Sequence, residues 1–257
     1  MTRLRTLAGL TLTSLLLFSA GCSSKAKKGA FTPLTAPSWT TQLEVKGFGP
    51  ATVALPLGAT TPRPIVVVLH GAHDRADWQC GSFRGVLGGN VFILCPQGQV
   101  DAAQGGTYGF GSYDDAAVEL RAGLAALKAR FGAHAAPSPV LLIGYGEGAA
   151  LAADLARQEP AFFARVALVA GNPAALSPSA IKIFSERGGK RMLFFCGEAE
   201  CEASGVERAL LLTRAGLAAK AVKADVGPYL DQRFTDALKR EVPWLVEGET
   251  RWGRPAR

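Results

Sequence analysis

Acyl-transfer chemistry needs a nucleophile, a base, a carboxylate that orients the base, and hydrogen-bond donors for an oxyanion. One stretch of the chain has a form that could assemble such groups. It runs from Val140 to Ala150, where a short apolar run enters a turn that contains Gly144, Gly146 and Gly148 and continues into residues rich in Ala and Leu. A buried strand, a sharp corner and a helix are predicted there.

Strands and helices that could position this corner alternate along the chain. Apolar runs too short for helices predict buried strands at 64–69, 91–95, 140–143, 166–170 and 191–196, and an alternating run predicts a last strand at 220–226. Helices are predicted at 76–87, 114–131, 147–158, 177–187, from Cys201 to about 217, and at 230–246. An antiparallel hairpin is predicted at 39–48 and 51–56, and a glycine-rich loop at 104–112.

This alternation indicates a mostly parallel sheet with helices on both faces and an N-terminal antiparallel hairpin, an α/β fold. No repeat or interior linker interrupts it between 39 and 250, so one domain is predicted there. Ligands of such sheets bind beyond the carboxyl ends of the strands. The residues expected at these ends are His70, Cys95, Gly146, Gly171 and Glu200.

The N-terminus predicts export. Arg3 and Arg5 precede an apolar run at 7–18 that is too short to span a bilayer comfortably, and three small residues stand before Cys22. The arrangement is similar to a bacterial lipobox, although Ser19 replaces the usual leucine. We therefore expect a signal peptide at 1–21, a lipid anchor on Cys22 and a flexible tether at 22–38, with an ordinary signal peptide as the alternative.

The basic charge belongs to the chain ends. The whole chain has 28 Lys and Arg against 21 Asp and Glu, and eight of the basic residues lie in 1–30 and 251–257, which leaves 20 against 21 in the body. No basic cluster of the kind that binds nucleic acid is evident. The basic ends, including a tail at 251–257, would meet acidic envelope surfaces or simply stay solvated. By the rule for enteric bacteria, the residue after Cys22 predicts the outer membrane, on its periplasmic or surface side.

Four cysteines remain if Cys22 is acylated, and an exported chain should oxidise them. Three pairings are possible. We favour Cys80–Cys95 and Cys196–Cys201, because each pair lies within one strand–turn–helix neighbourhood. The cysteines lack further metal ligands, because no Cys-x-x-Cys pair exists and only His73 lies near a cysteine. No metal and no other cofactor are therefore expected.

The chain resembles the α/β-hydrolase superfamily over nearly its whole length after the tether. The residues at two strand ends carry this resemblance. Leu69-His70-Gly71-Ala72 is similar to its oxyanion turn, and Gly144–Gly148 to its nucleophile elbow, G-x-S-x-G. Cys95-Pro96-Gln97-Gly98 resembles secreted polyhydroxybutyrate-depolymerase-like and feruloyl-esterase-like members. The resemblance implies oxyanion donors at the N–H groups of Ala72 and Glu147, and an acid at Glu200. A surface glutamate beside a disulfide is the alternative for Glu200.

At two positions of the family's catalytic triad, this chain has a residue that cannot do the chemistry. Gly146 stands at the nucleophile position, and Pro228 stands where the family has its histidine. His70 is expected in the oxyanion turn and His134 at the opposite end of the sheet. Glu147 could activate water in place of the nucleophile, but the resemblance implies that its side chain points away from the site. Ser112 is the other candidate nucleophile, and no base is expected near it. Aromatic residues that could line the remaining pocket are Trp78, Tyr108, Phe110 and Tyr113.

These residues predict an inactive hydrolase-like lipoprotein that binds a small molecule or an envelope partner. The alternatives are an active esterase-like or lipase-like hydrolase with a rearranged site, and a structural envelope lipoprotein whose cleft is filled, for example by Tyr229 or by the glycine-rich loop.

Overall fold

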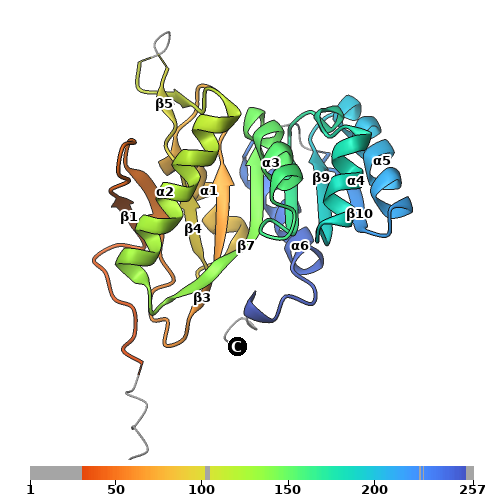
Figure 1. Ribbon diagram of the computed structural model, residues 1–257. Coiled ribbons are helices and arrows are strands. Elements are labelled where there is room, and N and C mark those ends of the chain that lie inside the picture. Colours follow the sequence, from red (N-terminus) through yellow and green to blue (C-terminus); the bar gives the residue numbers. More distant parts are fainter. Residues whose placement is uncertain (1–30, 102–104, 226, 228, 253–257) are drawn as a thin grey trace, which may run out of the picture. The chain divides into compact units, whose positions relative to one another are not determined.

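The computed structural model describes residues 31–101, 105–225, 227 and 229–252 (Figure 1). The strands of its main sheet are β1 (Thr40–Leu43), β2 (Ala51–Ala54), β3 (Arg63–Leu69), β4 (Phe92–Cys95), β7 (Ala135–Tyr145), β8 (Arg165–Val169), β9 (Arg191–Cys196) and β10 (Ala218–Lys223). Within the described residues these eight strands have the order β1-β2-β4-β3-β7-β8-β9-β10. Strands β3, β4 and β7 to β10 are parallel, and β1 and β2 form the antiparallel hairpin at one edge. The predicted fold class is therefore confirmed.

The helices cover both faces of the sheet. They are α1 (Ala76–Leu87), α2 (Tyr113–Phe131), α3 (Glu147–Gln158), α4 (Pro178–Glu186), α5 (Ala199–Arg214) and α6 (Gln232–Leu245), with short 3-10 turns η1 (Pro173–Ala175) and η2 (Thr250–Trp252). Helices α2 to α5 lie on one face and α1 and α6 on the other (Figure 1). None of the helices in the described part of the chain is long and apolar enough to cross a membrane.

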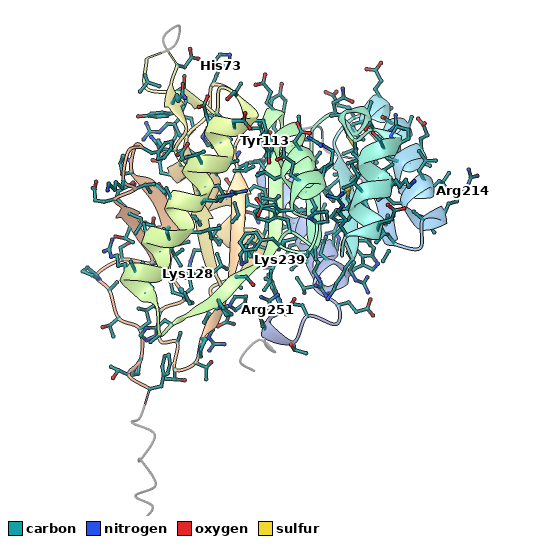
Figure 2. The ribbon with its side chains drawn as sticks, in the orientation of Figure 1. His73, Tyr113, Lys128, Arg214, Lys239 and Arg251 are labelled. Carbon is teal, nitrogen blue, oxygen red and sulfur yellow. A yellow bond between two sulfur atoms is a disulfide. The ribbon has the colours of Figure 1, made fainter. Side chains whose placement is uncertain are left out.

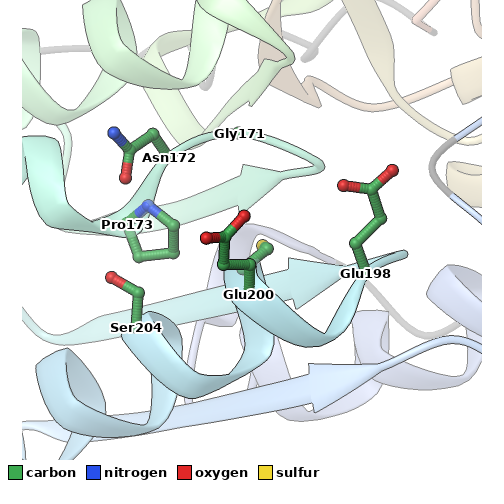
Figure 3. Close-up of a pocket in the computed structure, with 7 residues that line it drawn as sticks. Gly171, Asn172, Pro173, Glu198, Glu200 and Ser204 are labelled. Atoms are coloured by element: carbon green, nitrogen blue, oxygen red, sulfur yellow. The ribbon is translucent and has the colours of Figure 1, made fainter.

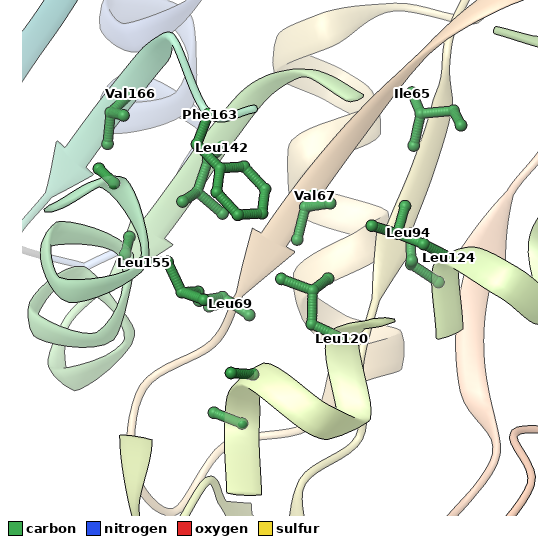
Figure 4. Packing of buried hydrophobic residues seen from close by; sticks show 14 of the residues in the cluster. Ile65, Val67, Leu69, Leu94, Leu120, Leu124, Leu142, Leu155, Phe163 and Val166 are labelled. Carbon is green, nitrogen blue, oxygen red and sulfur yellow. The ribbon is translucent and has the colours of Figure 1, made fainter. Parts of the chain in front are cut away.

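Alternation along the strands separates two hydrophobic cores. Ile65, Val67 and Leu69 of β3 point toward α2 and α3, whereas Val66 and Val68 pack under α1 and α6. Figure 4 shows the first of these cores, in which the three β3 side chains meet leucines of α2 and α3. Full burial of such a side chain contributes roughly 1.5–3 kcal/mol. Both faces of the strand are apolar because both are covered, which is why the run contains no polar residue.

Both predicted disulfides are confirmed. Cys80–Cys95 joins α1 to the end of β4, and Cys196–Cys201 joins the end of β9 to the first turns of α5. Each closes a short loop, of 15 and 5 residues in sequence separation. Disulfides of this kind are typical of proteins that fold outside the reducing cytosol.

The structure corrects several boundaries. The packed chain begins at Phe31 rather than at Trp39, because Leu34 is buried in the core and exchanges backbone hydrogen bonds with Gly58 and Ala59. The glycine-rich loop contains a strand, β6 (Tyr108–Gly109), which pairs with β5 (Gln99–Val100). Strand β7 starts five residues before Val140, where its register with β3 is irregular around prolines 137 and 139.

The basic tail is also partly packed. The Glu249 carboxylate accepts hydrogen bonds from the Arg251 side chain at 2.8 and 2.9 Å and pairs with Arg165 at 3.2 Å. Only 5% of the Arg165 side chain and 7% of the Glu249 side chain are exposed. Hydrogen bonding to Arg251, opposed by burial, lowers the pKa of Glu249 from 4.5 to about 2. Arg251 also donates to the Ser138 hydroxyl at 2.7 Å, so this network fastens η2 to the start of β7.

Candidate functional site

The corner between β7 and α3 has the geometry of a nucleophile elbow. Gly146 has φ +57° and ψ −122°, a backbone conformation that side-chain-bearing residues rarely adopt. A Cβ added to Gly144 would lie 2.2 Å from the carbonyl oxygen of Gly148. A Cβ on Gly148 would lie 2.4 Å from the carbonyl oxygens of Leu69 and His70. Only glycine at 144 and 148 lets α3 approach β3 this closely.

The middle glycine is different, because a side chain would fit there. The nearest atom to a Cβ on Gly146 would be the Cα of Gly71, at 3.5 Å, which is ordinary van der Waals contact. The Gly146 N–H is bonded to the carbonyl of Val169 at 2.9 Å, so the corner is held against β8. The corner therefore has room for a side chain at position 146, and the residue there is a glycine.

The turn after β3 lies directly against this corner. A Cβ on Gly71 would come within 3.9 Å of the Glu147 nitrogen. Glu147 is the first residue of α3, so its N–H has no acceptor within the helix and lies at the positive end of the helix dipole. The turn and the helix start enclose a cavity of about 480 Å³, the elbow cavity, lined by His70, Gly71, Ala72, Gly109, Phe110, Gly111, Glu147, Gly148, Ala150 and Leu151.

His70 supports the turn. Its ring is fully buried, and its nitrogens lie 2.7 Å from the carbonyl oxygen of Gly71 and 2.9 Å from that of Gln97. The ring also stacks against Phe110, with centroids 4.5 Å apart. Both ring nitrogens face backbone carbonyls, so His70 has no nitrogen left to take a proton from a group at the corner.

The turn at 95–98, which resembles secreted esterases, fixes His70 from behind. The Gln97 carbonyl faces the ring, and the N–H of Gly98 donates to the buried Glu119 carboxylate at 2.9 Å. Burial raises the pKa of Glu119, although hydrogen bonds from Gly98 and Gln97 act in the opposite direction. Gly98 has φ +76°, and a Cβ there would lie 2.5 Å from the Gly109 carbonyl oxygen. The 95–98 turn is thus a structural part of the site.

Glu200, at the predicted acid position, opens into a different cavity. It lies in the first turn of α5, exposed, and lines a cavity of about 470 Å³ with Gly171, Asn172, Pro173, Glu198, Cys201 and Ser204 (Figure 3). The Glu200 cavity borders the elbow through Gly171, since a Cβ there would lie 2.9 Å from the Gly146 carbonyl oxygen. Gly146 and Ala72 do not line it. Pro228, at the predicted base position, and Cys22 lie outside the described residues.

The structure brings together one pair that sequence reasoning missed. His73 Nδ1 contacts the Asp101 carboxylate, and 55% of the His73 side chain is exposed. His73 has φ +56°, which is uncommon outside glycine. The pair lines a cavity of about 260 Å³, the His73 cavity, which shares Ala72, Gly109 and Gly111 with the elbow cavity. The partners are 28 positions apart in the sequence, a separation that carries no spacing signal, and a histidine just past a strand end was the only clue.

The other candidates have local roles. Ser112 caps α2 by accepting from the N–H of Asp115, and it also donates to the Asp115 carboxylate at 2.7 Å. Phe110 lines the elbow cavity and Tyr108 the His73 cavity, whereas Trp78 lies on the surface beside Arg75. Tyr113, the first residue of α2, packs against the core. His134 lies just before β7, at the end of the sheet opposite the elbow, as predicted. Within the described residues no group of three His, Cys, Asp or Glu could hold a metal.

Comparison with known proteins identifies the fold. No family model and no curated protein sequence matches the chain. Solved structures do: the S-formylglutathione hydrolase of Staphylococcus aureus (TM-score 0.59, 14% identity, 81% of this chain and 98% of that chain) and a putative dienelactone hydrolase of Klebsiella pneumoniae (0.59, 15%, 81% and 98%). Esterase PE8 aligns with a TM-score of 0.57 at 18% identity, over 77% of this chain and 98% of its own. The chain has the α/β-hydrolase fold.

Proposed function

We propose that this protein is an exported lipoprotein, anchored through Cys22, that binds a small neutral carbonyl compound in the elbow cavity without forming an acyl-enzyme. The observation that carries the proposal is the corner between β7 and α3. Positions 144 and 148, where a Cβ would clash with the backbone, hold glycine, and position 146, where a side chain would fit, also holds glycine. Export is supported by the signal-like N-terminus and the two disulfides. The residue after Cys22 favours the outer membrane.

The lining of the elbow cavity indicates the chemistry of the ligand. Ala72 and Glu147 both line the cavity, and the resemblance to the α/β-hydrolases assigns to their N–H groups the role of donors to a carbonyl oxygen. Phe110, Ala150 and Leu151 supply an apolar wall for a short acyl chain. The Glu147 carboxylate at the rim disfavours a carboxylate ligand. A volume of about 480 Å³ lies within the range of small-molecule sites and argues against a filled, purely structural cleft.

A neutral ester should therefore stabilise the protein without being consumed. We expect p-nitrophenyl butyrate at tenfold its Kd to raise the Tm by about 3–6 °C, with no release of nitrophenolate above the buffer rate. Ala150→Trp, which fills the elbow cavity from an exposed helix position, should abolish the shift. Glu147→Gln should improve binding of butyrate, the carboxylate counterpart.

Ala125→Trp is the matched control, since Ala125 is exposed on α2 and does not line the elbow cavity. It should respond to the ester as the unmodified protein does. An identical shift in Ala150→Trp, or no shift in any of the proteins, would contradict binding in this cavity.

A second candidate function, slow ester hydrolysis by water, is favoured by the His73–Asp101 pair. A carboxylate that accepts from Nδ1 leaves Nε2 to take a proton from water, as in the base and acid of a triad. The water oxygen would attack a carbonyl held at Ala72 and Glu147, and the proton would pass through His73 to the departing alkoxide. The adjoining cavities make this arrangement possible without a side chain at 146.

If this second candidate is correct, nitrophenolate release from p-nitrophenyl butyrate should fall by roughly 10²–10⁴-fold in His73→Ala and in Asp101→Asn. His134→Ala changes a histidine at the opposite edge and should retain the rate. Equal rates in all three variants would exclude the pair as the base.

A further inference from the structure

The described unit begins at the end of the sheet opposite the cavities, where the parallel strands have their amino ends. The Phe31 ring meets the His134 ring edge to face at 4.8 Å, and His134 Nε2 lies 2.9 Å from the Thr32 carbonyl oxygen. The His134 carbonyl in turn accepts from the Arg63 N–H at 2.7 Å, just before β7 and at the start of β3. Phe31, the first described residue, therefore lies at the amino ends of the strands.

Basic residues gather at this same edge. We call them the basic edge: Arg63, Lys128, Arg130, Lys190, Arg191 and Arg251. Arg165 also lies at this end, but it is buried and is not part of the surface. Figure 2 shows Lys128 and Arg251 at this end and His73 at the other. In the described chain, Glu247 and Glu249 are the acidic partners of these residues, and they pair with Arg191, Arg165 and Arg251. Lys128, Arg130 and Lys190 are exposed, and none of the three forms an ion pair within the described residues. Arg130 donates to the Gln42 carbonyl at 2.8 Å, and Glu186, at the end of α4, pairs with Lys182.

Compensation of helix dipoles explains only part of this pattern. Lys128 and Arg130 lie in the last turn of α2, where positive charge is favoured. Lys190 instead precedes β9, held by its N–H bond to the Ala164 carbonyl at 2.8 Å, and Arg63 begins β3. The body from 31 to 250, which contains all of the basic edge except Arg251, carries 20 basic against 21 acidic residues, so the basic edge reflects a separation of charge rather than an excess.

We propose that the basic edge rests on a bilayer of anionic phospholipid, so that the elbow, His73 and Glu200 cavities face away from it. Lys and Arg near an anionic membrane surface are attracted to it within about a Debye length. The inference rests on the proposed anchor at Cys22. Eight residues, 23–30, then separate the anchor from Phe31 and span at most about 28 Å. This short reach keeps the basic edge near the lipid, and the ligand would reach the cavities from the solvent side.

Vesicle sedimentation tests the surface without the anchor. The chain from residue 22, carrying Cys22→Ser, should bind vesicles of 30% phosphatidylglycerol in phosphatidylcholine and not vesicles of phosphatidylcholine alone. The triple variant Lys128→Glu, Arg130→Glu, Lys190→Glu should bind at least tenfold more weakly, with an unchanged circular dichroism spectrum. The control variant Lys223→Glu, Arg233→Glu, Arg240→Glu makes the same charge change on the exposed surface of β10 and α6 and should bind as the parent does.

Undiminished binding by the first triple variant would overturn the inference, as would binding that disappears only when the tether lysines 25, 27 and 28 become Gln. The anchor is tested separately by palmitate labelling in cells, which Cys22→Ser should abolish. If labelling is absent and vesicle binding is intact, the proposed anchor on Cys22 is wrong and the proposed membrane-facing surface is supported. If labelling occurs without vesicle binding, the anchor is supported and the membrane-facing surface is wrong.

Discussion

Gly148→Ala should destabilise the fold severely. The added methyl would lie 2.4 Å from two backbone carbonyl oxygens, of Leu69 and His70, and 2.8 Å from the Leu69 carbonyl carbon. Neither side can yield, because β3 lies in the middle of the sheet and α3 is fixed by the Gly146 N–H bond to β8. A loss of more than about 4 kcal/mol is expected, a large share of the roughly 5–15 kcal/mol that stabilises a typical domain. Soluble expression and urea unfolding would measure it.

Gly146→Ala is the matched control. Its methyl meets only the Gly71 Cα at 3.5 Å, so its cost is the strain of φ +57°, about 1–3 kcal/mol. Gly146→Ser should fold equally well and, on its own, should not hydrolyse p-nitrophenyl butyrate through an acyl-enzyme, because the base position holds Pro228. Equal stability of the 146 and 148 variants would contradict the steric account. A burst of nitrophenolate from Gly146→Ser that disappears in Gly146→Ser, His73→Ala would identify His73 as a base for that serine.

Glu249→Gln should lower the free energy of unfolding by about 2–4 kcal/mol at pH 7, because it leaves the buried Arg165 guanidinium without its counter-charge. The pKa of Glu249 is about 2 in the fold against 4.5 as its ordinary value. Its ionised carboxylate therefore stabilises the fold above about pH 4.5, and this contribution is lost as the pH falls toward 2. The difference between the two proteins should be full at pH 7 and shrink across that window.

Urea unfolding at pH 7, 5 and 3 would follow this difference. Glu247→Gln is the control, because its side chain is 66% exposed and pairs with Arg191 at the surface. An exposed pair of this kind is worth less than about 1 kcal/mol. A pH-independent gap for Glu249→Gln would mean that lost packing, rather than lost charge, destabilises the variant.

The fold was predictable because its signals are local. Buried parallel strands are apolar on both faces, so runs such as 64–69 and 191–196 stand out, and α1 matches its predicted range. Elements without such periodicity were missed. The two-residue strands β5 and β6 are too short to show alternation, and the start of β7 contains prolines that a sheet normally excludes. Leu34 was assigned to a tether because one apolar residue among Pro and Thr carries no pattern.

The site was predictable where backbone requirements dictate residue type. Gly144 and Gly148 are glycines for steric reasons that the structure makes explicit, so the corner could be located from spacing alone. Side-chain pairs brought together by loops leave no such trace. His73 and Asp101 meet through the turn after β3 and the β5–β6 ribbon, which is joined to Asp74 through Tyr108. The separation of Glu200 from the elbow cavity likewise depends on tertiary packing rather than on sequence spacing.

Both ends of the folded unit, Phe31 and Arg251, are attached near the start of β7, and this has a practical consequence. Phe31 packs on His134 and Arg251 bonds to Ser138, so the two ends of the folded unit leave it within a few residues of each other along the same strand. Strand β7 then runs roughly 35 Å to Tyr145 beside the elbow. A fluorescent reporter fused at either end would leave the cavity mouths uncovered, and energy transfer between two such reporters would report on unfolding rather than on ligand occupancy.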